Sequence, residues 1–233
     1  MSNNGGRCSD RINVAIDGPA GAGKSTVARK VAEQLGYVYI DTGAMYRAVT
    51  LAANRAGIDP GEQDRLKELV EVLNIRLAPG ENGQMVFLNE EDVTSEIRSR
   101  DVTQHVSQVA SHESVRIRLV ELQRQLAAAR GIVMDGRDIG THVLPDAELK
   151  IFLTASVHIR ALRRYQELKD RTGVSLEQLE AEIAGRDLSD EQREISPLVC
   201  AKDAIRIDSS ELTIEQVVAL IQELGRTKLA EAK

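Results

Sequence analysis

Apolar runs and amphipathic stretches alternate along the chain and predict alternating strands and helices. Residues 12–16 form an apolar run that ends in Asp-Gly-Pro, and residues 37–41 form a second predicted strand. Between them, apolar residues recur every four positions over 27–35, which predicts the buried face of a helix that ends at Gly36. A strand, a helix and a strand in this order are typical of a parallel sheet with a right-handed crossover. We therefore expect an α/β fold.

The pattern changes after a third segment, a predicted helix at 43–56. Residues 64–73 suit another helix, and residues 74–94 alternate apolar and polar positions around two turn signals, which predicts a small antiparallel sheet. The remaining predicted elements are a long helix at 112–130, core strands at 131–135, 149–153 and 204–207, a helical segment at 156–195 with a cap at Ser175 and Gln178, and a closing helix with a cap at Thr213 and Gln216.

These elements predict a three-layer core with a central parallel sheet and two excursions from it. The predicted parts of the chain are the core (11–41, 131–155 and 203–226), an inserted region with the small antiparallel sheet (42–130), a helical arm (156–195) and a flexible N-terminal tail (1–10).

Composition and charge disfavour several classes of protein. The chain has 233 residues with 30 Lys and Arg against 36 Asp and Glu, a net charge of −6, so it lacks the basic character of a general nucleic-acid binder. Aromatic residues make up only 3%, which removes the stacking surface of single-strand binders. Cys8 and Cys200 have no metal-ligand spacing. Without a signal-peptide pattern or a run of membrane-spanning length, we expect a soluble cytoplasmic protein and no membrane partner. No amphipathic helix is left without a partner, so we expect a monomer.

Residues 18–25, "GPAGAGKS", match the phosphate-binding pattern G-x-x-x-x-G-K-[ST] at every fixed position, after a predicted strand and at the start of a helix. In such a loop, backbone N–H groups and the helix N-terminus bind phosphate oxygens, Lys24 reaches the β- and γ-phosphates, and Ser25 can ligate Mg²⁺. The predicted nucleotide-binding residues of the loop are Gly18, Pro19, Ala20, Gly21, Ala22, Gly23, Lys24, Ser25 and Thr26.

The loop predicts a nucleoside triphosphate but not what is done with it. A GTPase would carry Asn-Lys-x-Asp, and no Asn in this chain is followed by Lys. A small chain with two charge-rich excursions from its sheet favours a kinase of small molecules. The alternative from another class is a regulatory switch, which would release ADP without any acceptor.

Charged residues follow the predicted strands and should meet at one edge of the sheet, because parallel sheets collect their ligands at the carboxyl ends of their strands. Asp135 fits the second acidic position that helps to hold Mg²⁺ in P-loop enzymes. Arg47 could grip an anionic group across from the phosphate loop. The side chains expected to converge beside Arg47 are Lys24, Asp41, Thr42, Asp135, Arg137 and Asp138.

Several segments together resemble bacterial-type cytidylate kinase, a nucleoside-monophosphate (NMP) kinase. They are "GPAGAGKST", "DTGAMYRA", "SQVAS", "DGRDIGTHVLPDAELKIFL" and "RDLSDEQREISPL", and the resemblance runs from about residue 12 to about residue 224. Adenylate kinases instead place Gly-Phe-Pro-Arg after the corresponding Asp. The resemblance implies a P-loop kinase fold with an NMP-binding region and a helical lid, and transfer of the ATP γ-phosphoryl group to CMP or dCMP with Mg²⁺.

The resemblance also implies roles at the acceptor site. Uracil presents a carbonyl group where cytosine has an amine, so a carboxylate at Asp138 would disfavour UMP. Another monophosphate kinase, for UMP or AMP, is the nearer alternative. The residues implied to bind the CMP phosphate are Arg47, Arg137 and Arg193, those implied to read cytosine are Ser107, Arg116 and Asp138, and the other implied contacts are Thr42, Tyr46, Arg186 and Asp190.

The spacing of two of these residues makes a structural prediction. Ser107 and Arg116 are nine residues apart, which corresponds to about 180° around a continuous helix. They cannot both face the base from one straight helix. We therefore predict a break near Ser111, with Ser111 as the N-cap of the following helix.

The resemblance implies that the arm closes over ATP. Arg160 and Arg164 would then bind ATP, and Arg163 would contact the transferring group. Ordinary ion pairs such as Arg163 with Glu167 are the alternative. Ser189 stands where some family members carry a further Arg, which predicts fewer donor contacts. The residues that would share one face of a continuous arm helix are Arg186, Asp190 and Arg193.

The predicted mechanism needs no nucleophilic side chain. A phosphate acceptor is already ionised at neutral pH, so no general base is required. Catalysis would come from in-line positioning and from neutralising the charge on the transferring group. The predicted catalytic residues are Lys24, Arg137, Arg163 and Arg193.

Overall fold

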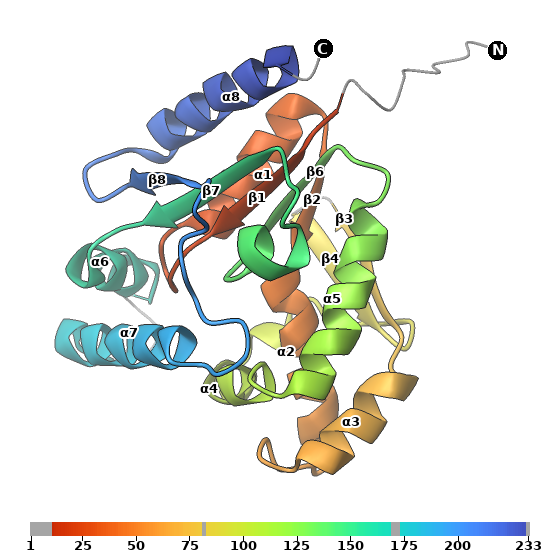
Figure 1. Ribbon diagram of the computed structural model, residues 1–233. Coiled ribbons are helices and arrows are strands. Elements are labelled where there is room, and N and C mark those ends of the chain that lie inside the picture. The colour runs from red at the N-terminus through yellow and green to blue at the C-terminus, as the bar shows by residue number, and fades with distance from the viewer. Residues whose placement is uncertain (1–10, 81–82, 169–172, 232–233) are drawn as a thin grey trace.

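The computed structural model describes residues 11–80, 83–168 and 173–231, so the predicted tail at 1–10, with Cys8, lies outside the described residues. At the centre is a five-stranded sheet in the order β2-β6-β1-β7-β8, and every neighbouring pair is parallel (Figure 1). The strands are β1 (Asn13–Asp17), β2 (Val38–Asp41), β6 (Ile132–Gly136), β7 (Leu149–Thr154) and β8 (Ile205–Asp208).

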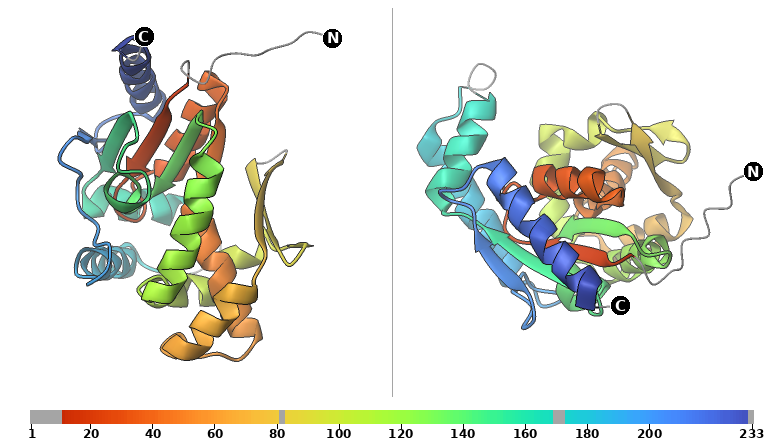
Figure 2. Two further views of the ribbon diagram at one scale, coloured as in Figure 1. Left: turned by 45° about the vertical axis from the view of Figure 1, so that its right-hand side comes forward. Right: turned by 90° about the horizontal axis from the view of Figure 1, so that it is seen from above.

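Alternating side chains of the strands build the two faces of this sheet. Val14 and Ile16 of β1 pack in one cluster with α1 (Lys24–Leu35) and α8 (Ile214–Glu231). Ala15, between them, packs in another cluster with Ala127 of α5 (Glu113–Ala127) and with the π-helical turn η3 (Ile139–Val143). The predicted three-layer core is confirmed, and Figure 2 shows helices on both sides of the sheet.

Glycines shape both ends of α1. Gly23 precedes the helix at φ 85° and Gly36 follows it at φ 64°, as the sequence predicts for its end. At Gly18, a Cβ atom would lie 1.9 Å from the Leu153 carbonyl oxygen, so only glycine lets the phosphate loop approach β7 this closely.

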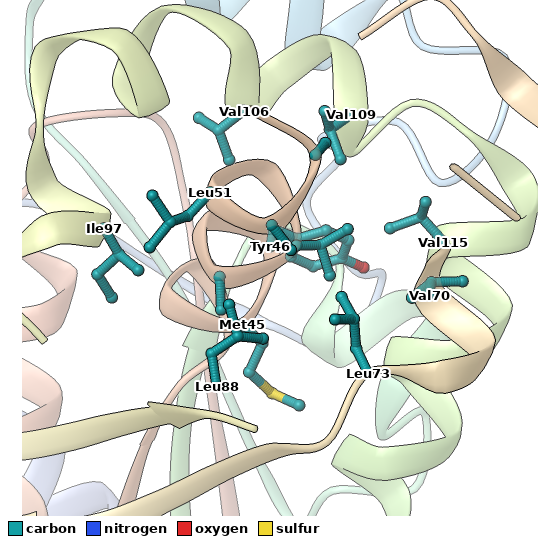
Figure 3. Packing of buried hydrophobic residues seen from close by; sticks show 14 of the residues in the cluster. Met45, Tyr46, Leu51, Val70, Leu73, Leu88, Ile97, Val106, Val109 and Val115 are labelled. Atoms are coloured by element: carbon teal, nitrogen blue, oxygen red, sulfur yellow. The ribbon is translucent and has the colours of Figure 1, made fainter. Parts of the chain in front are cut away.

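The second part of the fold contains the small antiparallel sheet that the sequence predicts. Its strands are β3 (Ile75–Gly80), β4 (Gly83–Leu88) and β5 (Glu91–Asp92) in the order β3-β4-β5. β3 and β4 pack in one cluster with α5, α2 (Thr42–Arg55), α3 (Gln63–Val72), the short turn η2 (Glu96–Arg98) and α4 (Arg100–Val109). Figure 3 shows labelled side chains from α3, β4, η2, α4 and α5 around those of α2. This part therefore has an apolar core of its own.

The predicted break between two helices is confirmed, but its predicted cap is wrong. α4 ends at Val109 and α5 begins at Glu113, with His112 at the N-cap position. Ser111 lies one residue before the N-cap position, and its hydroxyl donates a 2.7 Å hydrogen bond back to the carbonyl of Gln108.

The arm consists of α6 (Val157–Leu168) and α7 (Leu176–Glu191), which pack through Ala161, Leu179 and Ile183. The predicted capping box of Ser175 and Gln178 is confirmed, as are the two hydrogen bonds between Thr213 and Gln216. α8 continues to Glu231, beyond the predicted core boundary at 226.

The expectation that Arg193 continues the face of Arg186 and Asp190 is wrong. α7 ends at Glu191, and the chain then turns so that the Leu198 N–H donates a 2.8 Å hydrogen bond to the Asp190 carbonyl. α7 also contacts α4, so the arm reaches the part of the fold built on α2 (Figure 1). None of the described helices combines the length and apolar character needed to span a membrane.

Candidate functional site

A cavity opens at the carboxyl ends of β1, β2 and β6, and α4, α5 and α7 close its sides. It contains all ten residues that the sequence assigned to the acceptor, together with part of the phosphate loop. The lining residues are Ala20, Gly21, Lys24, Ser25, Asp41, Thr42, Gly43, Tyr46, Arg47, Arg98, Val106, Ser107, Ala110, Arg116, Asp135, Gly136, Arg137, Asp138, Arg186, Asp190 and Arg193.

Asp135 lies at the centre of the sheet edge, where its carboxylate joins two elements. Its two oxygens accept hydrogen bonds of 2.9 Å from the hydroxyls of Ser25 and Tyr39. The Thr42 hydroxyl donates a 2.8 Å hydrogen bond to the backbone carbonyl of Asp135. Burial, and then the charge of Asp41, raise the pKa of Asp135. A hydroxyl and a carboxylate side by side are hard oxygen donors, so Ser25 and Asp135 fit a Mg²⁺ ion.

Lys24 is buried beside this carboxylate at the start of α1. Its Nζ donates a 2.8 Å hydrogen bond to the carbonyl of Pro19 in the phosphate loop. Burial, and then the charge of Arg137, lower the pKa of Lys24, while Asp135 and Asp17 act against this. A bound polyphosphate would restore the favourable charge environment of this ammonium group.

Arg47, Arg137, Arg186 and Arg193 surround one side of the cavity. The Arg137 Nε atom pairs with Asp190 at 2.8 Å, and Arg47 donates to the Thr103 hydroxyl at 2.8 Å. Burial and the charge of Arg186 lower the pKa of Arg47 to about 10, and burial and Arg137 lower that of Arg186. These guanidinium groups therefore disfavour one another's charge, and a dianion between them would relieve that repulsion.

Arg116 and Asp138 form a buried ion pair that also lines the cavity. Arg116 donates to the Asp138 carboxylate and, at 3.2 Å, to the Ala110 carbonyl, while its Nε has no partner among the described residues. Its guanidinium lies 5.5 Å from the centroid of the Tyr46 ring. Because the helix is interrupted between α4 and α5, Ser107 and Arg116 can both line the cavity.

The three arginines of α6, which are Arg160, Arg163 and Arg164, do not line the cavity. The Arg160 guanidinium is buried and bonded to protein groups, including the Ala20 carbonyl. Arg163 donates to the Ser209 carbonyl at 2.6 Å. Arg164 is exposed and pairs with Glu167 at 2.9 Å, so the ion pair expected for Arg163 belongs to its neighbour. The Nε, Nη1 and Nη2 atoms of Arg160 each donate to a protein group, and its contact with ATP stays a prediction.

Three residues of the site were missed by sequence reasoning. Tyr39 donates a hydrogen bond to Asp135. Its position in the alternating pattern of β2 could have indicated which face of the sheet it lies on. Asp17 accepts hydrogen bonds from the N–H groups of Ile139 and Gly140, at 2.8 and 2.7 Å, and its place between β1 and the phosphate loop was a second signal. Arg98 lies 3.8 Å from Asp41, and nothing in its local sequence marks it.

Comparison with known proteins gives one consistent result. The family model described as cytidylate kinase matches residues 14–227. The cytidylate kinase of Exiguobacterium sibiricum is 57% identical over 220 residues, which cover 94% of this chain and 99% of that one. The cytidylate kinase of Bacillus cereus is 55% identical over 92% of this chain and 96% of its own. That of Limosilactobacillus fermentum is 56% identical over 89% of this chain and 92% of its own.

Solved structures agree with this chain in fold at low sequence identity. The crystal structure of an uncharacterized protein from Eubacterium ventriosum aligns with a TM-score of 0.52 at 15% identity, over 93% of this chain and 99% of that one. This likeness concerns the fold alone.

Proposed function

The chain belongs to the cytidylate kinase family, and on this premise we propose that it transfers the γ-phosphoryl group of ATP to CMP or dCMP by in-line displacement, giving ADP and CDP or dCDP. The single observation that carries the choice of acceptor is the buried pair of Arg116 and Asp138, which faces the same cavity as the phosphate loop and the arginine cluster.

The pair explains how cytosine would be recognised. The Asp138 carboxylate can accept from the exocyclic amine of cytosine, and the Arg116 guanidinium can donate to its ring nitrogen and carbonyl. Uracil would place a carbonyl against the carboxylate, leaving buried acceptors without a donor. We propose that Ser107 and Thr42 complete the base site and that Arg186 and Asp190 lie near the ribose.

The arginine cluster would hold the acceptor phosphate. Arg47, Arg137 and Arg193 offer planar donors that match phosphate oxygens. The charges of neighbouring arginines disfavour the charged forms of Arg47 and Arg193, so a bound anion would offset that repulsion. Because a phosphate oxygen is already ionised at neutral pH, no side chain needs to remove a proton.

The phosphate loop would hold the donor. Within residues 18–26, the backbone N–H groups, which all but Pro19 carry, and the N-terminus of α1 would bind the ATP phosphates, with Lys24 at the transferring group. Ser25 and Asp135 would hold Mg²⁺, Asp135 through water, and the ion would neutralise charge on the ATP phosphates. Contacts of Arg163 and Arg164 with ATP stay a prediction and require the arm to close, which would also exclude water.

An ADP-release assay with CMP, dCMP, UMP and AMP at fixed ATP and Mg²⁺ tests the proposal. We expect turnover with CMP and dCMP, and a kcat/KM at least about 100-fold lower with UMP and AMP. Asp138→Asn should reduce the preference for CMP over UMP, whereas Asp146→Asn, the same change at an exposed position, should not. Fast ADP release without a monophosphate would instead favour a regulatory switch. We also propose that the enzyme acts as a cytoplasmic monomer, and size-exclusion chromatography tests the monomer.

A further inference from the structure

The buried guanidinium of Arg160 joins three segments of the chain. Its Nη1 donates a 2.8 Å hydrogen bond to the Ala20 carbonyl of the phosphate loop, and its Nε donates at 2.8 Å to Ala155, which follows β7. Its Nη2 donates at 2.6 Å to Oδ2 of Asp187 on α7. A Cβ atom at Gly21 would lie 3.4 Å from the Cβ of Arg160, so α6 packs directly on the phosphate loop.

Asp187 connects this guanidinium to the acceptor side of the cavity. It lies on α7 between Arg186 and Asp190, and both of these neighbours line the cavity while Asp187 does not. Asp187 is 9% exposed, and its Oδ1 has no hydrogen-bond partner among the described residues. Among the described residues, the hydrogen bond to the Asp187 carboxylate comes from Arg160.

Stability alone does not require this pair. α6 and α7 already pack through Ala161, Leu179 and Ile183. A buried ion pair is often no more stabilising than apolar side chains of similar volume. What the pair adds is a polar connection from α7 to a backbone carbonyl of the phosphate loop, which the apolar contacts do not make.

We propose that Arg160 and Asp187 are positioning residues that couple the binding of acceptor and donor. The inference rests on the proposed function, in which Arg186 and Asp190 contact CMP. A bound acceptor holds α7 in place through Arg186 and Asp190. Asp187 on the same helix then holds the Arg160 guanidinium through their hydrogen bond. Arg160 in turn holds the Ala20 carbonyl, and therefore the loop that binds ATP. By linkage, each substrate then tightens the binding of the other by the same factor.

A direct contact between Arg160 and ATP makes a different prediction. Asp187 does not line the cavity, and its negative charge near a polyphosphate would be unfavourable. If Arg160 bound ATP directly, Asp187→Asn would leave ATP affinity unchanged or raise it. Under the coupling role, Asp187→Asn removes the ability of CMP to tighten ATP binding.

Calorimetric titration of a non-hydrolysable ATP analogue, with and without saturating CMP, measures the coupling. For the unaltered protein we expect CMP to lower the analogue's Kd by about 5-fold or more. In Asp187→Asn and Arg160→Lys the ratio of the two Kd values should approach one. Glu182→Gln, an exposed carboxylate on the same helix, should keep the ratio of the unaltered protein.

A double variant separates positioning from stability. Arg160→Met with Asp187→Leu removes both charges together and should keep a thermal midpoint close to that of the unaltered protein, yet still lack coupling. An unchanged Kd ratio in Asp187→Asn, or a ratio of one in the unaltered protein, would overturn the positioning role. CMP turnover by the unaltered protein is scored separately: turnover without coupling overturns only this inference, and absence of CMP turnover overturns both.

Discussion

The Tyr39 hydroxyl donates a 2.9 Å hydrogen bond to Oδ1 of Asp135, whose other oxygen accepts from Ser25. Burial raises the pKa of Tyr39, so the phenol stays a donor at neutral pH. Tyr39 thus orients the carboxylate that we propose helps to hold Mg²⁺, without lining the cavity itself.

Tyr39→Phe should therefore weaken the response to Mg²⁺. We expect the half-saturating Mg²⁺ concentration to rise by about 10-fold, because partners that orient a metal ligand typically contribute about 10- to 100-fold to affinity or activity. The lost hydrogen bond should cost about 1 kcal/mol in the free energy of unfolding. Urea denaturation and ADP release against Mg²⁺ concentration measure the two effects.

Tyr37→Phe is the matched control, because the Tyr37 hydroxyl accepts a 3.2 Å hydrogen bond from the Ile12 N–H and does not line the cavity. It should leave the Mg²⁺ response unchanged. An equal shift in both variants would contradict the role of Tyr39.

Removing Arg137 should separate acceptor from donor. Arg137 pairs with Asp190 and lines the acceptor side, so we expect Arg137→Ala to raise the KM for CMP by about 100-fold or more, the loss of a charge-assisted contact of about 3 kcal/mol. ATP binding, measured calorimetrically, should stay nearly unchanged. Arg130→Ala, which removes an arginine paired with Glu148 outside the cavity, should affect neither substrate. Equal loss of ATP and CMP binding in Arg137→Ala would argue against an acceptor role.

Space at Gly136 should matter for the acceptor site. A Cβ atom there would lie 2.7 Å from the Ile139 side chain and 2.8 Å from the Thr42 hydroxyl. Gly136→Ala should destabilise the fold by about 1–3 kcal/mol and raise the KM for CMP, because Thr42 and the turn after Asp138 must shift.

Gly225→Ala on α8 serves as the control for this substitution. Its added Cβ would meet only Leu149, at an ordinary 3.9 Å, so the variant should be neutral or more stable by up to about 1 kcal/mol. Thermal denaturation and CMP kinetics distinguish the two variants, and a CMP KM unchanged by Gly136→Ala would refute the expected shift.

Asp17 should make stability depend on pH. Burial raises its pKa to about 6, against the hydrogen bonds from Gly140 and Ile139 that lower it. An acid whose pKa is higher in the folded state stabilises the fold most below its unfolded pKa of 3.8, and this contribution is lost as the pH rises through about 6. One pKa unit corresponds to about 1.4 kcal/mol, so the change between pH 4 and 7 should reach a few kcal/mol.

Asp17→Asn lacks this titration. The free energy of unfolding of the unaltered protein minus that of the variant should therefore be larger at pH 5 than at pH 8. Urea denaturation at both pH values measures it. A difference that stays constant or grows toward pH 8 would contradict the raised pKa.

Local sequence determined much of this protein. The phosphate loop is contiguous, so its glycines, Lys24 and Ser25 specify a site within one turn. Helix and strand periods placed the strands of the sheet. The nine-residue spacing of Ser107 and Arg116, together with the base contacts that the family resemblance implied for both, predicted the break between α4 and α5. These features depend on neighbours in the chain, whose geometry the backbone fixes.

Only the tertiary structure decided how side chains with several possible partners were used. The family resemblance implied an ATP contact for Arg160, and the structure shows hydrogen bonds from its guanidinium to the phosphate loop and to α7 that no local pattern indicated. Arg193 lies beyond the end of α7 and still reaches the cavity, because the chain turns back. Asp17 accepts hydrogen bonds from two backbone N–H groups of a turn more than a hundred residues away in the sequence. Which partners a charged side chain contacts depends on the groups that folding brings near it, and neither periodicity nor spacing in the sequence specifies those groups.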